Sequence, residues 1–187
     1  SNLKADAVWS FYLGGGISPE DFYARFVDKN SSLEEYKNCL NIILKEFGFC
    51  EDIEKRISDL PEKFIAFHIR RGDKVRSVPN DNGITYDEVE HLNSLTLKYI
   101  DESIENGHEN FFVCGDEEDK LKLFTDYIES KQKRCLKYEI SPKWKSTYFE
   151  LAILSKASEI VLSQKYSSFS FFSSLLGGSN FKTVYSL

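Results

Sequence analysis

The stretch KFIAFHIRRGDK, Lys63–Lys74, passes from mainly apolar residues directly into a cluster of charged side chains. Its apolar part, Phe64–Ile69, has the length of a strand and does not alternate between apolar and polar residues. This pattern is typical of a parallel strand covered on both faces of its sheet. We therefore expect a buried strand whose end carries His68, Arg70 and Arg71.

Strands and helices are predicted to alternate along the rest of the chain. The further strands are expected at Phe111–Cys114, Cys135–Ile140, Ile160–Ser163 and Phe181–Tyr185. The helices are expected at Thr85–Glu105, Glu117–Ser130, Thr147–Ala157 and Ser168–Leu176. Such alternation is typical of βαβ units. It predicts an α/β fold over residues 61–187, a Rossmann-like parallel sheet with helices on both faces.

Residues 1–60 are predicted to form a helical lead-in to this domain. Ser18 and Pro19 followed by two acids are a helix-start signal. The apolar positions from Leu33 to Phe47 recur every three or four residues, which indicates a second helix. A short charged helix is expected at Glu51–Leu60. The glycines of Leu13–Ser18 predict a loop, or alternatively a contact with a donor or acceptor.

Composition limits the classes of function. The net charge of −6 and the pI near 5.2 argue against a nucleic-acid binder. No apolar run approaches the roughly 20 residues that span a bilayer. The four cysteines and three histidines do not have the spacing of metal ligands, so we expect no metal site and no cofactor. The cysteines are interpreted as buried thiols of a cytoplasmic protein. The chain begins without Met or a signal pattern, which favours a fragment. The oligomeric state is not predicted.

Two segments are candidates for an anion site. Arg70 can bind phosphate oxygens through its guanidinium, with Arg71 anchored elsewhere, for example on Asp73 or Asp116. Ser167–Gly178 opens a helix after a strand, and a helix N-terminus offers N–H groups to anions. The alternatives are structural ion pairs for the arginines and an ordinary serine cap for the helix. The Arg71–Asp73 triplet also matches an integrin-binding motif, which would not suit the end of a buried strand.

Three motifs in this order resemble the superfamily of α1,2-, α1,6- and protein O-fucosyltransferases. They are HIRRGDK (His68–Lys74), FFVCGDEE (Phe111–Glu118) and ELAILSKASEIVLSQKYSSFS (Glu150–Ser170). The resemblance implies the C-terminal half of a GT-B glycosyltransferase. It also implies metal-independent transfer of fucose, or a related sugar, from a GDP-sugar to a glycan acceptor with inversion.

The resemblance also implies roles for individual residues. Arg70 would hold the β-phosphate and stabilise the leaving GDP as the catalytic residue. The remaining nucleotide-sugar-binding residues would be His68, Arg71, Asp73, Asp116, Glu150, Ser168, Phe169 and Ser170. The family usually has Asp at the position of Glu150, and its Gly-rich N-terminal turn is missing here. No general base is evident.

Three functions follow from these observations. The first is a fucosyltransferase of polysaccharide biosynthesis that acts on a bacterial surface glycan, in the cytoplasm or at the inner face of the membrane. The second is a non-catalytic nucleotide-sugar-binding domain without its acceptor half. The third is an α/β interaction module whose arginines are structural.

Overall fold

The computed structural model of the 187-residue chain describes residues 38, 42, 46, 49–71, 75–76, 84–138, 143–164 and 167–184. Most of the predicted lead-in, including the helix start at Ser18 and the glycines of Leu13–Ser18, lies outside this part. Asn38, Ile42 and Glu46 are helical. The last helix of the lead-in, α4 (Glu51–Ile57), begins where expected but ends three residues before Leu60, and its Ile57 is buried in the core.

The main sheet has five parallel strands in the order β5-β4-β1-β6-β7. Their bounds are β1 Ile65–Ile69, β4 Asn110–Gly115, β5 Arg134–Leu136, β6 Glu159–Leu162 and β7 Asn180–Thr183. Numbered along the chain, these strands stand in the order 3-2-1-4-5. This is the order of a doubly wound dinucleotide-binding sheet, and it reverses between β1 and β6. The predicted Rossmann-like α/β fold is confirmed.

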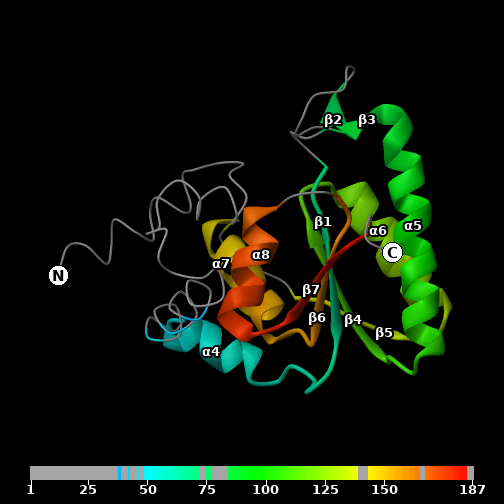
Figure 1. The fold of residues 1–187 in the computed structure, drawn as a ribbon. Helices are drawn as coiled ribbons and strands as arrows, with labels where there is room; N and C mark the ends of the chain where they lie inside the picture. The colour runs from blue at the N-terminus through cyan, green and yellow to red at the C-terminus, as the bar shows by residue number, and fades with distance from the viewer. Residues whose placement is uncertain are drawn as a thin grey trace.

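Helices cover both faces of the sheet (Figure 1). One face carries α5 (Tyr86–Glu105) and α6 (Glu118–Ser130). The other face carries α4, α7 (Lys143–Lys156) and α8 (Ser168–Gly177). Because successive strand residues point to opposite faces, β1 contributes to both layers of the core.

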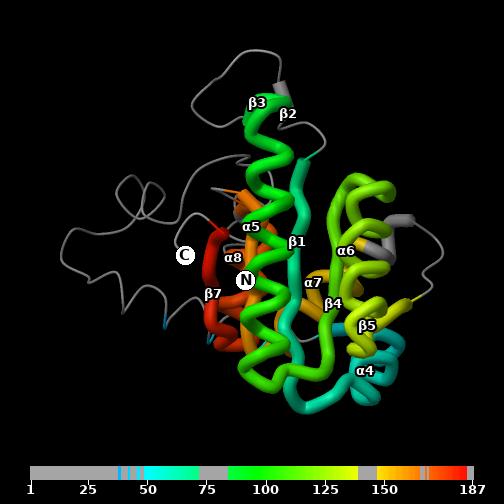
Figure 2. Tube along the Cα trace, turned by 90° about the vertical axis from the view of Figure 1, so that its right-hand side faces the viewer, coloured from blue at the N-terminus to red at the C-terminus, as the bar shows by residue number. Residues whose placement is uncertain are grey.

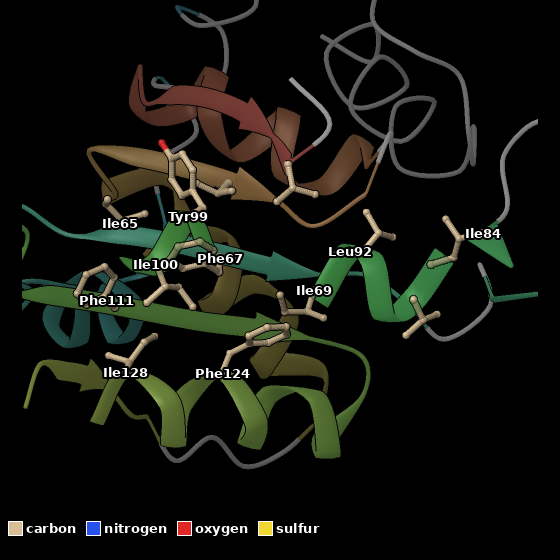
Figure 3. Packing of buried hydrophobic residues seen from close by; sticks show 13 residues of the cluster. Ile65, Phe67, Ile69, Ile84, Leu92, Tyr99, Ile100, Phe111, Phe124 and Ile128 are labelled. Carbon is tan, nitrogen blue, oxygen red and sulfur yellow. The ribbon is translucent and has the colours of Figure 1, made fainter. Parts of the chain in front are cut away.

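The two layers of the core contain different side chains of β1. Phe67 and Ile69 pack with Ile100, Phe124 and residues of the same cluster beneath α5 and α6 (Figure 3). Ala66, two residues before His68, packs in the other layer with residues of α4 and α7. All five residues of β1 are buried, as the absence of alternation predicts.

Most element boundaries differ from the prediction by one to four residues. Helix α7 begins at Lys143, four residues before the expected start. Strand β5 ends at Leu136, because Lys137 and Tyr138 have left the ladder. Two short strands that the sequence did not predict follow Arg71. They are β2 (Val75–Arg76) and β3 (Ile84–Thr85), which pair in parallel beside the start of α5 (Figure 2).

The cysteine prediction is partly wrong. Cys114 is buried and Cys135 is half-buried, but Cys50 is exposed because it lies at the N-terminus of α4, outside the sheet. Cys39 lies outside the described residues.

Candidate functional site

The candidate site lies at the carboxyl edge of the sheet, where β1 ends between β4 and β6. In the register of the sheet, His68 pairs with Cys114 on one side and with Leu162 on the other. The residues that follow these strands therefore meet at one edge. In open parallel sheets this edge binds ligands, at the point where the strand order reverses.

His68 connects β1 to the start of α8 across that point. Its Nδ1 is hydrogen-bonded to the Ser170 hydroxyl, and the Ser167 hydroxyl lies 3.5 Å from the same nitrogen. The Phe169 ring lies 5.4 Å from the imidazole, centroid to centroid. Burial lowers the pKa of His68 from 6.5 to about 4, so the imidazole is neutral at pH 7. A neutral imidazole can both donate and accept a hydrogen bond.

The first turn of α8 supplies hydroxyl and backbone groups at the same place. Ser167 is the N-cap, and its hydroxyl accepts a hydrogen bond from the Ser170 N–H at 3.4 Å. Ser168 begins the helix, and the Ser170 side chain is buried against His68. Phe169 packs against the core layer of α4 and α7. The start of α8 is therefore fixed against the end of β1, with the positive end of its dipole at the sheet edge.

Arg70 follows β1 directly and places a positively charged side chain at this carboxyl edge of the sheet. Its Nη1 donates to Asp116 Oδ2 at 2.7 Å, and the side chains of Arg70 and Asp116 are 37% and 22% exposed. An ion pair of this exposure contributes little to stability. The contact is one of the anchors that the sequence left open, although we expected it for Arg71 rather than Arg70.

Arg71 points the other way and is fully buried. Its Nη2 donates to Asn93 of α5 at 2.9 Å, its Nη1 donates to the Ser163 carbonyl at 3.4 Å, and its backbone N–H donates to Asp116 Oδ1 at 2.8 Å. Arg71 thus joins the ends of three strands to α5. Strand alternation predicts this separation of the two arginines to opposite sides.

Glu150 brings a carboxyl group into the layer of α7. Burial raises its pKa from 4.5 to about 7. The pKa of the buried Cys114 thiol is raised by burial and by the charge of Glu150. Cys114 lies in the core layer that contains residues of α7, and its sheet partner His68 faces the same side as Ala66 of that layer. Glu150, on α7, therefore lies on the same side of the sheet as His68. A carboxyl group at this depth is suited to accept hydrogen bonds from a ligand that enters the edge.

The structure thus brings together His68, Phe169 and Ser170 at the start of α8, and Arg70, Arg71 and Asp116 at the ends of β1 and β4. Asp73 lies outside the described residues. Within the described ranges, no group of three or more His, Cys, Asp or Glu side chains could hold a metal ion. None of the described helices is both long enough and apolar enough to cross a membrane.

Sequence reasoning missed three residues at this edge: Asn93, Ser163 and Gly115. Asn93 had a detectable signal, because it is a polar residue on the apolar face of the predicted helix. Gly115 is needed because a Cβ there would lie 2.0 Å from the Ile69 carbonyl oxygen. That close approach, and the role of the Ser163 carbonyl, depend on strand pairing and had no local signal.

Comparison with known proteins gives a match in structure alone. No family model matches the sequence, and no curated protein matches it. The crystal structure of POFUT1 in complex with GDP-fucose is similar with a TM-score of 0.52 and 18% identity, over 75% of this chain and 47% of that chain. POFUT1 in complex with GDP gives a TM-score of 0.54 and 18% identity, over 84% and 52%.

The chain spans about half the length of these structures. At this level of identity the comparison establishes the fold. The expectation of a fucosyltransferase-like fold is confirmed.

Proposed function

We propose that this chain is the donor-binding half of a glycosyltransferase that transfers fucose, or a closely related sugar, from a GDP-sugar to a glycan acceptor with inversion. The observation that carries the proposal is the contact between His68 and Ser170. It joins the end of β1 to the start of α8 at the point where the strand order reverses, which is where sheets of this type bind nucleotides. The fold shared with POFUT1 bound to GDP-fucose supports the choice of nucleotide.

The diphosphate would be held by Arg70 and by the N-terminal turn of α8. A guanidinium carries a permanent charge and presents several N–H donors in one plane, which suits phosphate oxygens. The first N–H groups of a helix have no partner within the helix, so they add donors for an anion. On a protein with a net charge of −6, such a local arrangement is what an anionic ligand requires.

In the transfer step an acceptor hydroxyl would attack the anomeric carbon while the bond from that carbon to the β-phosphate oxygen breaks. GDP leaves with the bonding electrons, and Arg70 stabilises the negative charge that develops on it. The hydroxyl proton passes to a general base, and we assign no residue of this chain to that role. The step needs no change of oxidation state, and we propose that it proceeds without a metal.

The nucleobase would be recognised by Glu150, with His68, Phe169 and the serines of α8 as further contacts. A carboxylate can accept two N–H groups from one edge of guanine, whereas the same edge of uracil presents a single N–H between two carbonyls. Because burial disfavours the charge of Glu150, a ligand that donates to this carboxylate would offset part of that cost.

The alternative is a nucleotide-sugar-binding domain that does not itself catalyse transfer. In the catalytic case, we propose a bacterial surface glycan as the acceptor and the cytoplasm, or the inner face of the membrane, as the place of action. Donor-dependent release of GDP in the presence of an acceptor glycan, compared with GDP binding alone, distinguishes the two.

The first test is calorimetric titration of the chain with GDP and with UDP. We expect saturable binding of GDP in preference to UDP. Arg70→Ala should weaken GDP binding by about tenfold to a hundredfold, because a charge-assisted hydrogen bond contributes ~1.5–3 kcal/mol. Arg134→Ala, which removes an exposed arginine at the opposite edge of the sheet, is the matched control and should bind as the wild type does. Equal affinity for UDP, or unchanged binding by Arg70→Ala, would contradict the proposal.

A further inference from the structure

We propose that Asp116 does not itself bind the nucleotide but is a positioning residue that presents Arg70 to the donor diphosphate. The inference rests on the proposed function, because it explains how the proposed donor site gains part of its affinity for a diphosphate. Each carboxylate oxygen of Asp116 has a different partner. Oδ1 accepts the Arg71 backbone N–H at 2.8 Å, and Oδ2 accepts Arg70 Nη1 at 2.7 Å.

The first of these bonds fixes the carboxylate to the end of β1. The Asp116 N–H in turn donates to the Ile69 carbonyl at 3.3 Å. Gly115 permits this approach, because a Cβ on it would lie 2.0 Å from the Ile69 oxygen. Two hydrogen bonds thus hold Asp116 between β1 and β4, and they fix the orientation of its carboxylate independently of Arg70.

The second bond restrains the long Arg70 side chain. Arginine has among the largest side-chain entropies, and ordering it on ligand binding lowers affinity. At 37% and 22% exposure, the pair contributes little to folding stability. The Arg70–Asp116 pair therefore adds little to the stability of the fold but restrains the group proposed to bind phosphate. Preorganisation of the site explains this pair better than stabilisation of the fold does.

Asp116 also has an opposing effect, since a carboxylate near the site repels a diphosphate. We infer that orientation prevails, because Asp116 is the first of four consecutive acids, residues 116–119. Removing one of the four changes the local potential only in part.

The test compares GDP with GMP, because GMP lacks the β-phosphate that Arg70 is proposed to bind. Asp116→Asn keeps an oxygen for the Arg71 N–H and removes the charge that holds Arg70. We expect GDP to bind about tenfold more weakly to this variant and GMP to bind within twofold of the wild type. In the Arg70→Ala background, Asp116→Asn should cause no further loss of GDP affinity. Asp126→Asn, which removes the exposed ion pair with Lys122 on α6, is the matched control.

A second variant, Asp116→Glu, keeps the charge but moves it by one methylene. Weaker GDP binding by this variant is expected if position matters, whereas unchanged binding would assign the effect to charge alone and overturn the inference. The inference is equally overturned by tighter GDP binding in Asp116→Asn, by equal losses for GDP and GMP, or by additive losses in the double variant. Failure of the wild type to bind GDP would refute the proposed function, and this inference with it. Wild-type binding with an unaffected Asp116→Asn refutes this inference alone.

Discussion

Glu150 and His68 are predicted to give the folding free energy two opposite dependences on pH. Burial raises the pKa of Glu150 from 4.5 to about 7 and lowers that of His68 from 6.5 to about 4. Each unit of pKa corresponds to about 1.4 kcal/mol, so the charged form of either group is disfavoured in the folded chain by about 3 kcal/mol.

The sign follows from which state binds more protons. Folded Glu150 keeps its proton to a higher pH than the unfolded chain does, so its contribution is fully present below pH 4.5 and is lost as pH rises through about 7. Folded His68 resists protonation, so its contribution is fully present above pH 6.5 and is lost as pH falls toward about 4. Between pH 4.5 and 6.5 the two contributions oppose each other in the wild type.

The variant Glu150→Gln removes the pH-dependent contribution of Glu150 and leaves that of His68 in place. Urea denaturation of this variant and of the wild type at pH 4, 5, 6, 7 and 8 gives the difference in unfolding free energy at each pH. We expect the unfolding free energy of the variant to rise by about 3 kcal/mol relative to the wild type between the lowest and the highest pH. The reason is that the amide of glutamine does not ionise, whereas Glu150 must ionise in a buried position. His68→Gln should instead gain relative to the wild type as pH falls.

The control is Glu102→Gln, which alters an exposed ion pair with Lys98 on α5 and should change stability by less than about 1 kcal/mol throughout. A difference between Glu150→Gln and the wild type that stays constant from pH 4 to pH 8 would refute the reasoning, because it would mean that Glu150 titrates alike in the folded and unfolded chains. A difference that falls with pH would refute it more strongly.

Three further substitutions test the fold around the site. Gly115→Ala should lower the unfolding free energy by about 3 kcal/mol or more in urea denaturation, because the added Cβ would lie 2.0 Å from the Ile69 carbonyl oxygen. Thr85→Ala should cost about 1 kcal/mol in thermal unfolding, since it removes the capping box at the start of α5. Tyr99→Phe should cost about 1 kcal/mol by the same measurement, because the Tyr99 hydroxyl donates to Glu159 in a partly buried position.

Each of these has a control in the same chain. Gly107→Ala introduces a Cβ that meets nothing within 4 Å, although its backbone φ of +86° is strained for alanine, so its cost should be smaller than that of Gly115→Ala. Ser94→Ala alters an exposed serine within α5 and should leave the capping interaction intact. Tyr86→Phe, at a residue that is 67% exposed, should not change stability measurably. Equal effects in a variant and its control would contradict the assigned cause.

The sequence alone determined which segments become strands and helices, because these depend on short-range patterns. The unbroken apolar run of β1 predicts a strand buried on both faces. A hydroxyl at Ser167 and two glycines after Leu176 mark the ends of α8, where Gly178 adopts φ +72°. The strands β2 and β3 escaped prediction because two residues are too few to show a period.

Only the tertiary structure decided how these elements meet. His68 and Ser170 are 102 residues apart in the chain, and they touch because β1 and β6 are neighbours in the sheet. The sequence predicted a phosphate-binding arginine with a second one anchored, but strand pairing decided that Asp116 binds the Arg70 side chain and the Arg71 backbone. Likewise, the burial that raises the pKa of Glu150 exists only after α7 packs on the sheet. Hydrogen bonds between distant segments and the removal of water from a carboxyl group are properties of the assembled layers, so no local pattern encodes them.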